Sequence, residues 1–326
     1  MRRSLSLMVV CTTIFLSLML VTTGAGAEEL PGLDVFVVGH HAYVAAESNG
    51  LNVIDIRIPA EQKLVAAVDT PGEATGVYVI SSFAYVAAGS AGLQVVDVSN
   101  PASPVLSGSV DTPGDARDVF VFGDYACVAD ARAGLQVVSI RNARSPRIVA
   151  GIDTPGKAHA IHVLGDHAYV ADGSGGLQII SIQKPTRPEI IAFVGAPRDA
   201  RSVAVISDHA YVADFSGGIY AINISNPKSP RLAGSVNTPG EAQDVYPLYD
   251  LLIVADGSSG LQLIDARKPT ALNSVGAYNT PGDAHGVYGL ASKVYVAGLG
   301  FGLGVYDVID RARLNTPGNF LFNPNR

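Results

Sequence analysis

Polar side chains that could bind a ligand or transfer protons recur along this chain at a spacing of 42 residues. One set holds two imidazoles, two guanidinium groups and one amide: Arg117, His159, Arg201, Gln243 and His285. A second set holds carboxylates at the same spacing: Asp130, Asp172, Asp214 and Asp256. Imidazole and carboxylate together can act as general acid and base, and convergent polar groups in a concavity can bind a small anionic or polar ligand. The elements that carry these residues decide which chemistry is available.

Those elements belong to a repeat whose clearest copy is Ala168 to Ile182, AYVADGSGGLQIISI. An apolar position recurs every 42 residues at Tyr43, Tyr85, Cys127, Tyr169, Tyr211, Ile253 and Tyr295. A glycine keeps the same step at Gly50, Gly92, Gly134, Gly176, Gly218, Gly260 and Gly302. Seven units fill residues 31 to about 315, and each contains short β-branched runs separated by turn residues. This period and content predict an all-β fold, a seven-bladed β-propeller with one four-stranded blade per 42-residue repeat.

Each repeat divides into four expected strands. The first follows the motif TPG, as in Val77–Ile80, and a two-residue turn such as Gly123-Asp124 leads to the second, AYVA. A glycine-rich loop, DGSGG at Asp172 to Gly176, joins it to the third strand, which reads GLQVVDV in one copy. Prolines limit the fourth strand, for example Pro104–Val110, as expected at an outer edge. The last repeat is shorter, so we expect ring closure through residues 28–30 or through residues 312–315.

The N-terminus has a different composition. Two arginines precede an apolar run from Leu5 to Val21, and Ala25-Gly26-Ala27 provides small residues for cleavage. We therefore predict a signal peptide at residues 1–27 and a propeller domain at residues 28–326, with no membrane insertion after cleavage. An uncleaved anchor of similar length is the alternative. The prediction places the protein outside the cytoplasm, in the periplasm, at the cell surface or secreted.

Charge and cysteine content narrow the expected partners. Cleavage would remove two of the 22 basic residues and none of the 29 acidic ones, which leaves a net charge of −9. Such a charge argues against nucleic acid and anionic membranes as partners. Cys127 would be the one remaining cysteine, which indicates an inert buried thiol and no disulfide framework. We expect a monomer that is stabilised by ring closure.

The repeat resembles a known family. The segments TPG, AYVAD and GLQVVDVSNP, followed by a second proline, are similar to those of LVIVD-repeat proteins. The resemblance covers all seven copies and implies a β-propeller in a secreted or surface-located prokaryotic protein, with no shared reaction. Two places depart from the pattern: Ala196-Pro197-Arg198 replaces TPG, and Leu252-Ile253-Val254 replaces AYV.

In such a blade the TPG and DGSGG loops lie on one face of the disc, around the mouth of the central channel. The two polar sets would then form a mixed-charge rim. A structural role is the alternative, because Asp at the start of a glycine-rich turn commonly accepts hydrogen bonds from nearby backbone amides. By analogy with WD-repeat propellers, His159 could also pair with Asp172, and Arg201 with Asp214, to hold the loops together.

Several chemistries lack the residues they need. There is no close-spaced zinc-ligand cluster, and DGSGG offers one carboxylate where calcium usually needs several oxygen ligands. We assign no catalytic residue, no metal ligand and no cofactor. The expected function is a non-enzymatic scaffold that binds a protein or a surface polymer through the TPG and DGSGG face. A hydrolase or lyase that uses His159, His285 and an aspartate at the channel mouth is the alternative.

Overall fold

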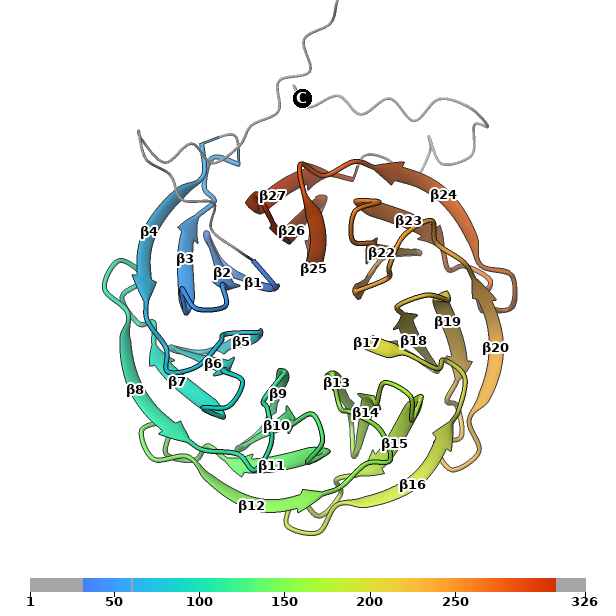
Figure 1. Cartoon of the computed structure of the whole chain (residues 1–326), viewed down its shortest axis with the longest axis horizontal. Helices are drawn as coiled ribbons and strands as arrows, with labels where there is room; N and C mark the ends of the chain where they lie inside the picture. The colour runs from blue at the N-terminus through green and yellow to red at the C-terminus, as the bar shows by residue number, and fades with distance from the viewer. Residues whose placement is uncertain (1–31, 60, 309–326) are drawn as a thin grey trace, which may run out of the picture.

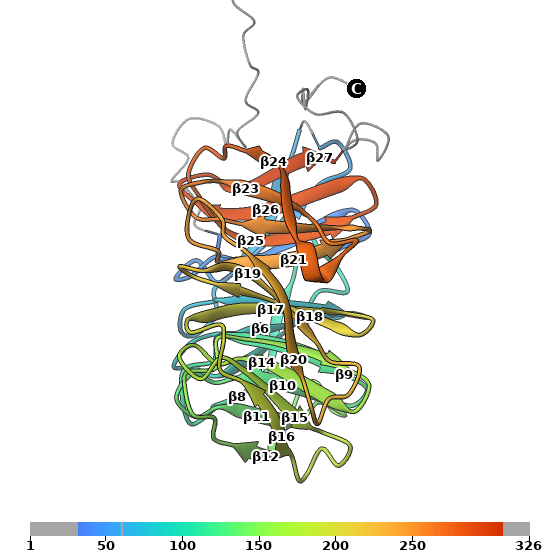
Figure 2. The ribbon, with the colours of Figure 1, turned by 90° about the vertical axis from the view of Figure 1, so that its right-hand side faces the viewer.

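The computed structural model describes residues 32–59 and 61–308. In this part of the chain, 27 strands form seven antiparallel sheets that stand like blades around a central axis (Figure 1). Figure 2 shows the resulting disc from its edge. Six sheets have four strands and the last has three. The predicted seven-bladed propeller is therefore confirmed. The signal peptide predicted at 1–27 and the two segments considered for ring closure lie outside the described residues.

In each blade the strands follow one another from the axis outwards, so that β1 is innermost and β4 outermost in blade 1 (Figure 1). Blades 1 to 3 contain β1 (Asp34–Val38), β2 (His41–Ala45), β3 (Leu51–Asp55), β4 (Lys63–Val68), β5 (Gly76–Ile80), β6 (Phe83–Ala87), β7 (Leu93–Asp97), β8 (Val105–Val110), β9 (Asp118–Phe122), β10 (Tyr125–Ala129), β11 (Leu135–Ser139) and β12 (Arg147–Ile152). Blades 4 and 5 contain β13 (Ala160–Leu164), β14 (His167–Ala171), β15 (Leu177–Ser181), β16 (Glu189–Val194), β17 (Ala200–Ile206), β18 (His209–Asp214), β19 (Gly218–Asn223) and β20 (Arg231–Val236). Blades 6 and 7 contain β21 (Asp244–Leu248), β22 (Leu251–Ala255), β23 (Leu261–Asp265), the 3-10 helix η1 (Pro269–Ala271), β24 (Asn273–Tyr278), β25 (Asp283–Leu290), β26 (Lys293–Leu299) and β27 (Gly302–Asp307).

The turns between the first two strands of a blade have the conformation that the Gly-Asp pairs predict. Gly123, Gly165 and Ser207 all have positive φ, between 52° and 58°, and each begins a two-residue hairpin. Glycine adopts this conformation without the steric penalty of a Cβ atom. The tight hairpins hold the inner strands in register and present their tips on one face of the disc, which we call the hairpin face. The TPG and DGSGG loops lie on the other face, here the loop face.

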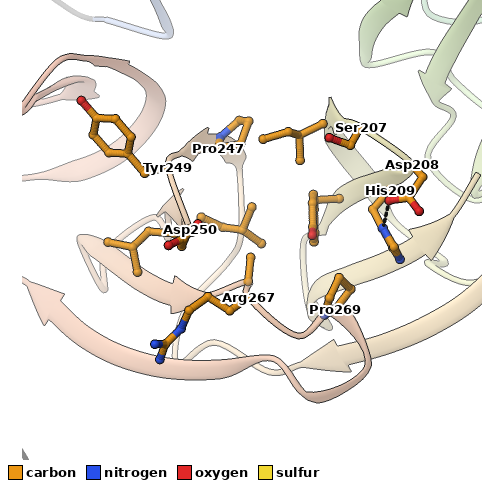
Figure 3. A pocket seen from close by; sticks show the side chains of 13 residues that line it. Ser207, Asp208, His209, Pro247, Tyr249, Asp250, Arg267 and Pro269 are labelled. Atoms are coloured by element: carbon orange, nitrogen blue, oxygen red, sulfur yellow. Dashed lines mark hydrogen bonds and ion pairs between the residues drawn. The ribbon is translucent and has the colours of Figure 1, made fainter. Parts of the chain in front are cut away.

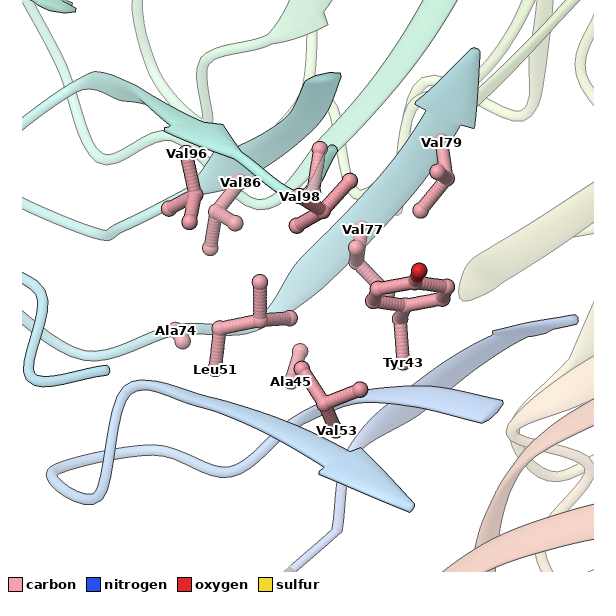
Figure 4. Close-up of a cluster of buried hydrophobic side chains, with 11 residues drawn as sticks. Tyr43, Ala45, Leu51, Val53, Ala74, Val77, Val79, Val86, Val96 and Val98 are labelled. Carbon is pink, nitrogen blue, oxygen red and sulfur yellow. The ribbon is translucent and has the colours of Figure 1, made fainter. Parts of the chain in front are cut away.

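Apolar packing between neighbouring blades forms the core. Between blades 1 and 2, Tyr43, Leu51 and Val53 pack against Val77 and Val96 (Figure 4). Comparable clusters fill the other interfaces, and the last contains Val35 and Ile54 of blade 1 with Tyr295 and Leu303 of blade 7. Because both faces of the middle strands are covered, their side chains are buried almost without exception. Packing of blade 7 on blade 1 closes the ring in the described part of the chain.

Candidate functional site

The ends of the innermost strands carry the first polar set to the channel mouth on the loop face. The backbone N–H groups of Arg117, His159 and Gln243 donate to the carbonyls of Ala129, Ala171 and Ala255, at 2.8 Å each. These bonds extend the ladder between the first two strands by one residue. The 42-residue spacing therefore places the set around the axis, one residue per blade.

A basic cluster occupies the part of this rim that belongs to blades 3 to 5. It consists of Arg117, Lys157, His159 and Arg201. The charges of the two arginines and the lysine each lower the pKa of His159. Burial is the largest cause, and together they lower this pKa to about 4. His159 lies over Gly173, where an added Cβ would be 3.4 Å from Nε2. The imidazole is therefore neutral near pH 7. The positive charges of the cluster are those of the two arginines and the lysine, and both arginines have an aspartate beside them.

Arg201 is fixed more firmly than the other cations of the cluster. Its Nε lies 2.9 Å from a carboxylate oxygen of Asp199, and its guanidinium group stacks over the ring of Phe215 at 4.7 Å. Its side chain is 33% exposed, and that of Arg117 is 44% exposed with a looser contact of 3.9 Å to Asp115. Stacking and pairing hold Arg201 in one orientation while part of its fork remains accessible.

His285 has a different environment. Burial lowers its pKa, but the charged groups that act on it are Asp283, Glu47 and Glu241, from the side of the ring formed by blades 1, 6 and 7. The charges that act on His159 come from blades 3 to 5. His159 thus lies mainly among cations and His285 mainly among carboxylates, and the two histidines belong to different parts of the ring.

The second polar set lies beneath the loop face instead of on it. Asp130, Asp172 and Asp256 have no exposed surface, and Asp214 is 3% exposed. In blade 4, Asp172 accepts hydrogen bonds from Thr154 Oγ1 at 2.5 Å and from the Gly156 amide at 2.8 Å. The equivalent threonines and glycines bind Asp130 and Asp256 in the same way. Each carboxylate therefore fastens the TPG loop to its blade, and none is accessible to a ligand.

Asp214 shows how this arrangement adapts. The residue equivalent to the TPG threonine is Ala196, so no hydroxyl is available, and the carboxylate accepts from the amides of Arg198, Asp199, Ser216 and Gly217 instead. The hypothetical pairs of His159 with Asp172 and Arg201 with Asp214 are replaced by these contacts. In this structure the four carboxylates hold loops together, with partners different from those expected by analogy with WD-repeat blades.

A third set of carboxylates, which the sequence patterns did not single out, lies one residue after the positions of the first polar set. Asp34, Asp118 and Asp244 begin the innermost strands of blades 1, 3 and 6. Each carboxylate accepts a hydrogen bond from the amide of the following residue. Each also accepts one from an amide of the next blade, at 2.8 Å, and the donors are Val77, Ile161 and Val287. Their positions differ by multiples of 42, so the same spacing analysis could have found them. They join blades to one another at the axis.

Below this level, aromatic rings line the channel. Phe36 contacts Tyr78 and Tyr288 with centroid distances of 4.7 and 4.9 Å, and Phe120 contacts Tyr78 and His162 at 4.9 and 5.0 Å. The equivalent residue of blade 5 is Ala204, so the series of ring contacts is interrupted between His162 and Tyr246. Burial lowers the pKa of His162 to about 4, so this imidazole is a neutral part of the channel wall.

Two further features of the described residues bear on function. No group of three or more His, Cys, Asp or Glu side chains in residues 32–59 and 61–308 has a geometry that could hold a metal ion. No helix in that part of the chain is long and apolar enough to cross a membrane.

The family is now clear. The LVIVD repeat profile matches residues 33–70, 71–112, 113–154, 155–194, 197–238 and 239–280, which is well over half of the chain, so this protein belongs to the LVIVD repeat family. No curated protein matches the sequence.

Among solved structures, the computationally designed Ika8 protein is similar, with a TM-score of 0.64 and 7% identity over 86% of this chain and 98% of that one. The Cps50 (Swd1) β-propeller domain of Myceliophteria thermophila is similar with a TM-score of 0.70 and 12% identity, over 87% of this chain and 98% of that one. At such identities the likeness concerns the fold alone.

Proposed function

We propose that this protein is an exported, non-enzymatic scaffold that binds an anionic region of a partner protein or surface polymer through its loop face. The observation that carries the proposal is the basic cluster of Arg117, Lys157, His159 and Arg201 at the channel mouth. The cluster holds three cations and the two aspartates that lie against its arginines, so it keeps one net positive charge in a chain whose formal net charge is −7. Complementary charge at such a cluster speeds association and selects acidic partners.

The stacked Arg201 supports a binding role. A guanidinium group that is already oriented loses less side-chain entropy when it forms a bidentate bond to a carboxylate or sulfate. The separation of His159 from His285 counts against the alternative of a hydrolase or lyase, because acid and base must both reach one substrate. Export rests on the predicted signal peptide at residues 1–27.

The proposal is tested with poly-L-glutamate and dextran sulfate as anionic probes on a sensor surface. We expect reversal of two charges, Arg117→Glu with Arg201→Glu, to weaken binding at least about ten-fold, because both attraction and orientation are lost. Arg141→Glu is the matched control, since Arg141 is 69% exposed and lies on the hairpin face. Equal loss in the control, or unchanged binding in the double variant, would contradict a site on the loop face.

The enzymatic alternative needs its own measurement. The purified protein is screened with chromogenic ester, phosphate and glycoside substrates beside His159→Ala and His285→Ala. We expect no activity that depends on either histidine. Turnover that disappears in one of these variants would overturn the non-enzymatic assignment.

A further inference from the structure

A groove of about 350 Å³ opens on the hairpin face between blades 5 and 6, away from the loop face (Figure 3). Ile206 and Tyr211 of blade 5 form one wall, and Pro247, Leu251 and Leu252 of blade 6 form the other. Ala266 and Pro269, which follow β23, add to the apolar part of the lining, and the polar part comes from residues 207–209, 249, 250 and 267. The groove therefore combines aliphatic walls with a comparable share of polar surface.

The groove exists because blade 6 departs from the repeat at two positions. Ala266 occupies the place that a larger aliphatic residue fills in the other blades: Ile56, Val98, Ile140, Ile182, Ile224 and Val308. Pro247 occupies the place of a valine that packs against the preceding blade at Val79, Val121, Val163 and Val205. Blade 7 also lacks that valine, but Tyr246 and Leu248 lie against Gly289 there and occupy the space. At blades 5 and 6 the lost volume stays open.

The hairpin tip beside the groove is also unusual. Tyr249 has φ of +57° and is 61% exposed, at the position where the other blades have Gly, Ser or Ala. A bulky residue in the left-handed region costs free energy, and such strain is concentrated at functional sites. Here the strain places an aromatic ring at the rim of the groove.

The polar groups at the rim are mostly acidic. Asp208 lies on the blade 5 side and bonds His209 Nδ1 at 2.7 Å, and its side chain is 58% exposed. Asp250 lies on the blade 6 side. Arg267 is bound by Asp265 through two nitrogens and also lies within the field of Asp250, so these three groups together keep one net negative charge in blade 6. The rim consequently favours a cation next to the aliphatic interior.

An apolar surface continues from the groove towards the axis. Ile206 is 39% exposed and belongs both to the groove and to a series of exposed residues at the inner strand ends, with Val38 at 43%, Ile80 at 42%, Leu164 at 43% and Leu290 at 40%. Exposed apolar side chains that gather around a concavity mark protein interaction sites.

We infer that the groove between blades 5 and 6 binds an extended segment of a partner protein that inserts one large apolar side chain between Ile206 and Leu251 and carries Lys or Arg next to it. The basic residue lies beside Asp208 and Asp250. The anchor fills the volume that Ala266 and Pro247 leave open. This site is independent of the proposed function, because it lies on the opposite face and selects the opposite charge.

The test is selection from a phage-displayed library of random heptapeptides on the purified protein. We expect enriched peptides to combine one Leu, Phe or Tyr with at least one Lys or Arg. Ala266→Ile restores the residue of the other blades and fills the groove, so capture of those peptides should fall at least about ten-fold. Ile224→Ala changes the equivalent residue of blade 5 and is the matched control, whose capture should equal that of the wild type.

A second variant keeps the groove open and removes its charge. Asp208→Asn combined with Asp250→Asn should reduce capture of the basic peptides several-fold while an apolar anchor is still selected. The inference is overturned by the absence of enrichment, by enrichment of acidic peptides, or by full capture with Ala266→Ile. Because Arg117→Glu and Arg201→Glu leave the groove untouched, their effect on poly-L-glutamate binding distinguishes failure of this site from failure of the loop-face proposal.

Discussion

A single residue at the inner end of each blade governs the contact with the next blade. Going round the ring, this position is occupied by Asp34, Gly76, Asp118, Ala160, Ser202, Asp244 and Gly286. Carboxylates alternate with small residues, and the small residues leave room for them: a Cβ on Gly76 would lie 2.9 Å from Asp118 Cα. Because the number of blades is odd, two small residues, Ala160 and Ser202, occupy neighbouring blades. Ser202 Oγ donates a hydrogen bond to Asp244 of the following blade at 2.5 Å.

These carboxylates predict an unusual pH dependence. Burial, followed by the charge of Asp244, raises the pKa of Asp34 from 3.8 to about 7. Between these values the folded protein holds a proton that the unfolded chain has lost, so this group's contribution to stability falls as pH rises from about 4 through about 7. The full effect is at most about 4 kcal/mol. Asp118 and Asp244 shift in the same direction.

The measurement compares denaturant unfolding of the wild type and Asp34→Asn across this range of pH. His159 and His162, whose pKa values are lowered, act with the opposite sign, so only the difference between the two curves isolates Asp34. We expect the stability of the wild type relative to the variant to decline from pH 4 to pH 7. Parallel curves would show that Asp34 titrates at its ordinary pKa.

At the level of elements, hydrogen bonds from the TPG loop to a buried aspartate hold the connection between two blades. The TPG loop leads from the outermost strand of one blade to the innermost strand of the next, and the buried aspartate at the end of the second strand anchors it. Blade 2 lacks this anchor because Ala88 stands at the aspartate position. Thr70 Oγ1, which would be its partner, is buried without a hydrogen bond in the described structure. A buried hydroxyl without a partner is a cost to stability.

We therefore expect Ala88→Asp to stabilise the protein by about 1 kcal/mol, since it would give the Thr70 hydroxyl the partner that Asp172 gives Thr154. The opposite change, Asp172→Ala, should destabilise by about 1–3 kcal/mol, because it leaves a hydroxyl and an amide unpaired. Thermal unfolding followed by circular dichroism measures both. A lower melting temperature for Ala88→Asp would refute the proposed equivalence of the two loops.

On the scale of the whole molecule, stability comes from closure. Each blade presents two apolar faces, and only a complete ring covers all of them. Blade 7 buries Ile253 and Leu263 of blade 6 on one side and Val35 and Ile54 of blade 1 on the other. The charged groups of the loop face and the groove on the hairpin face are therefore carried by one closed ring.

Deletion of residues 281–326 removes all three strands of blade 7. We expect the shortened chain to lose cooperative unfolding and to bind a dye for exposed apolar surface, because two inter-blade clusters would face water. Size-exclusion chromatography, dye fluorescence and thermal unfolding beside the intact chain provide the comparison. A monomer with a sharp transition would mean that six blades can close without the seventh.

The sequence alone determined the architecture. The 42-residue spacing fixed the number of blades, and alternating apolar runs with Gly-Asp turns placed the strands to within a residue, as for β5 and β8. These features are local, because strand pairing within a hairpin depends on residues close together in the chain. The positions of Arg117, His159 and Arg201 on one rim followed from the same repetition.

Only the tertiary structure decided what the polar residues do. Whether Asp172 faces a ligand or Thr154 depends on how the TPG loop folds back over the blade, and contacts such as Asp34 to Val77 form only when two blades pack. The groove at Ala266 likewise depends on volumes contributed by both blades, and Gly289 shows that a smaller residue can be compensated by its neighbours. Burial, pairing and open volume are properties of several segments together, whereas the repeat is a property of each segment by itself.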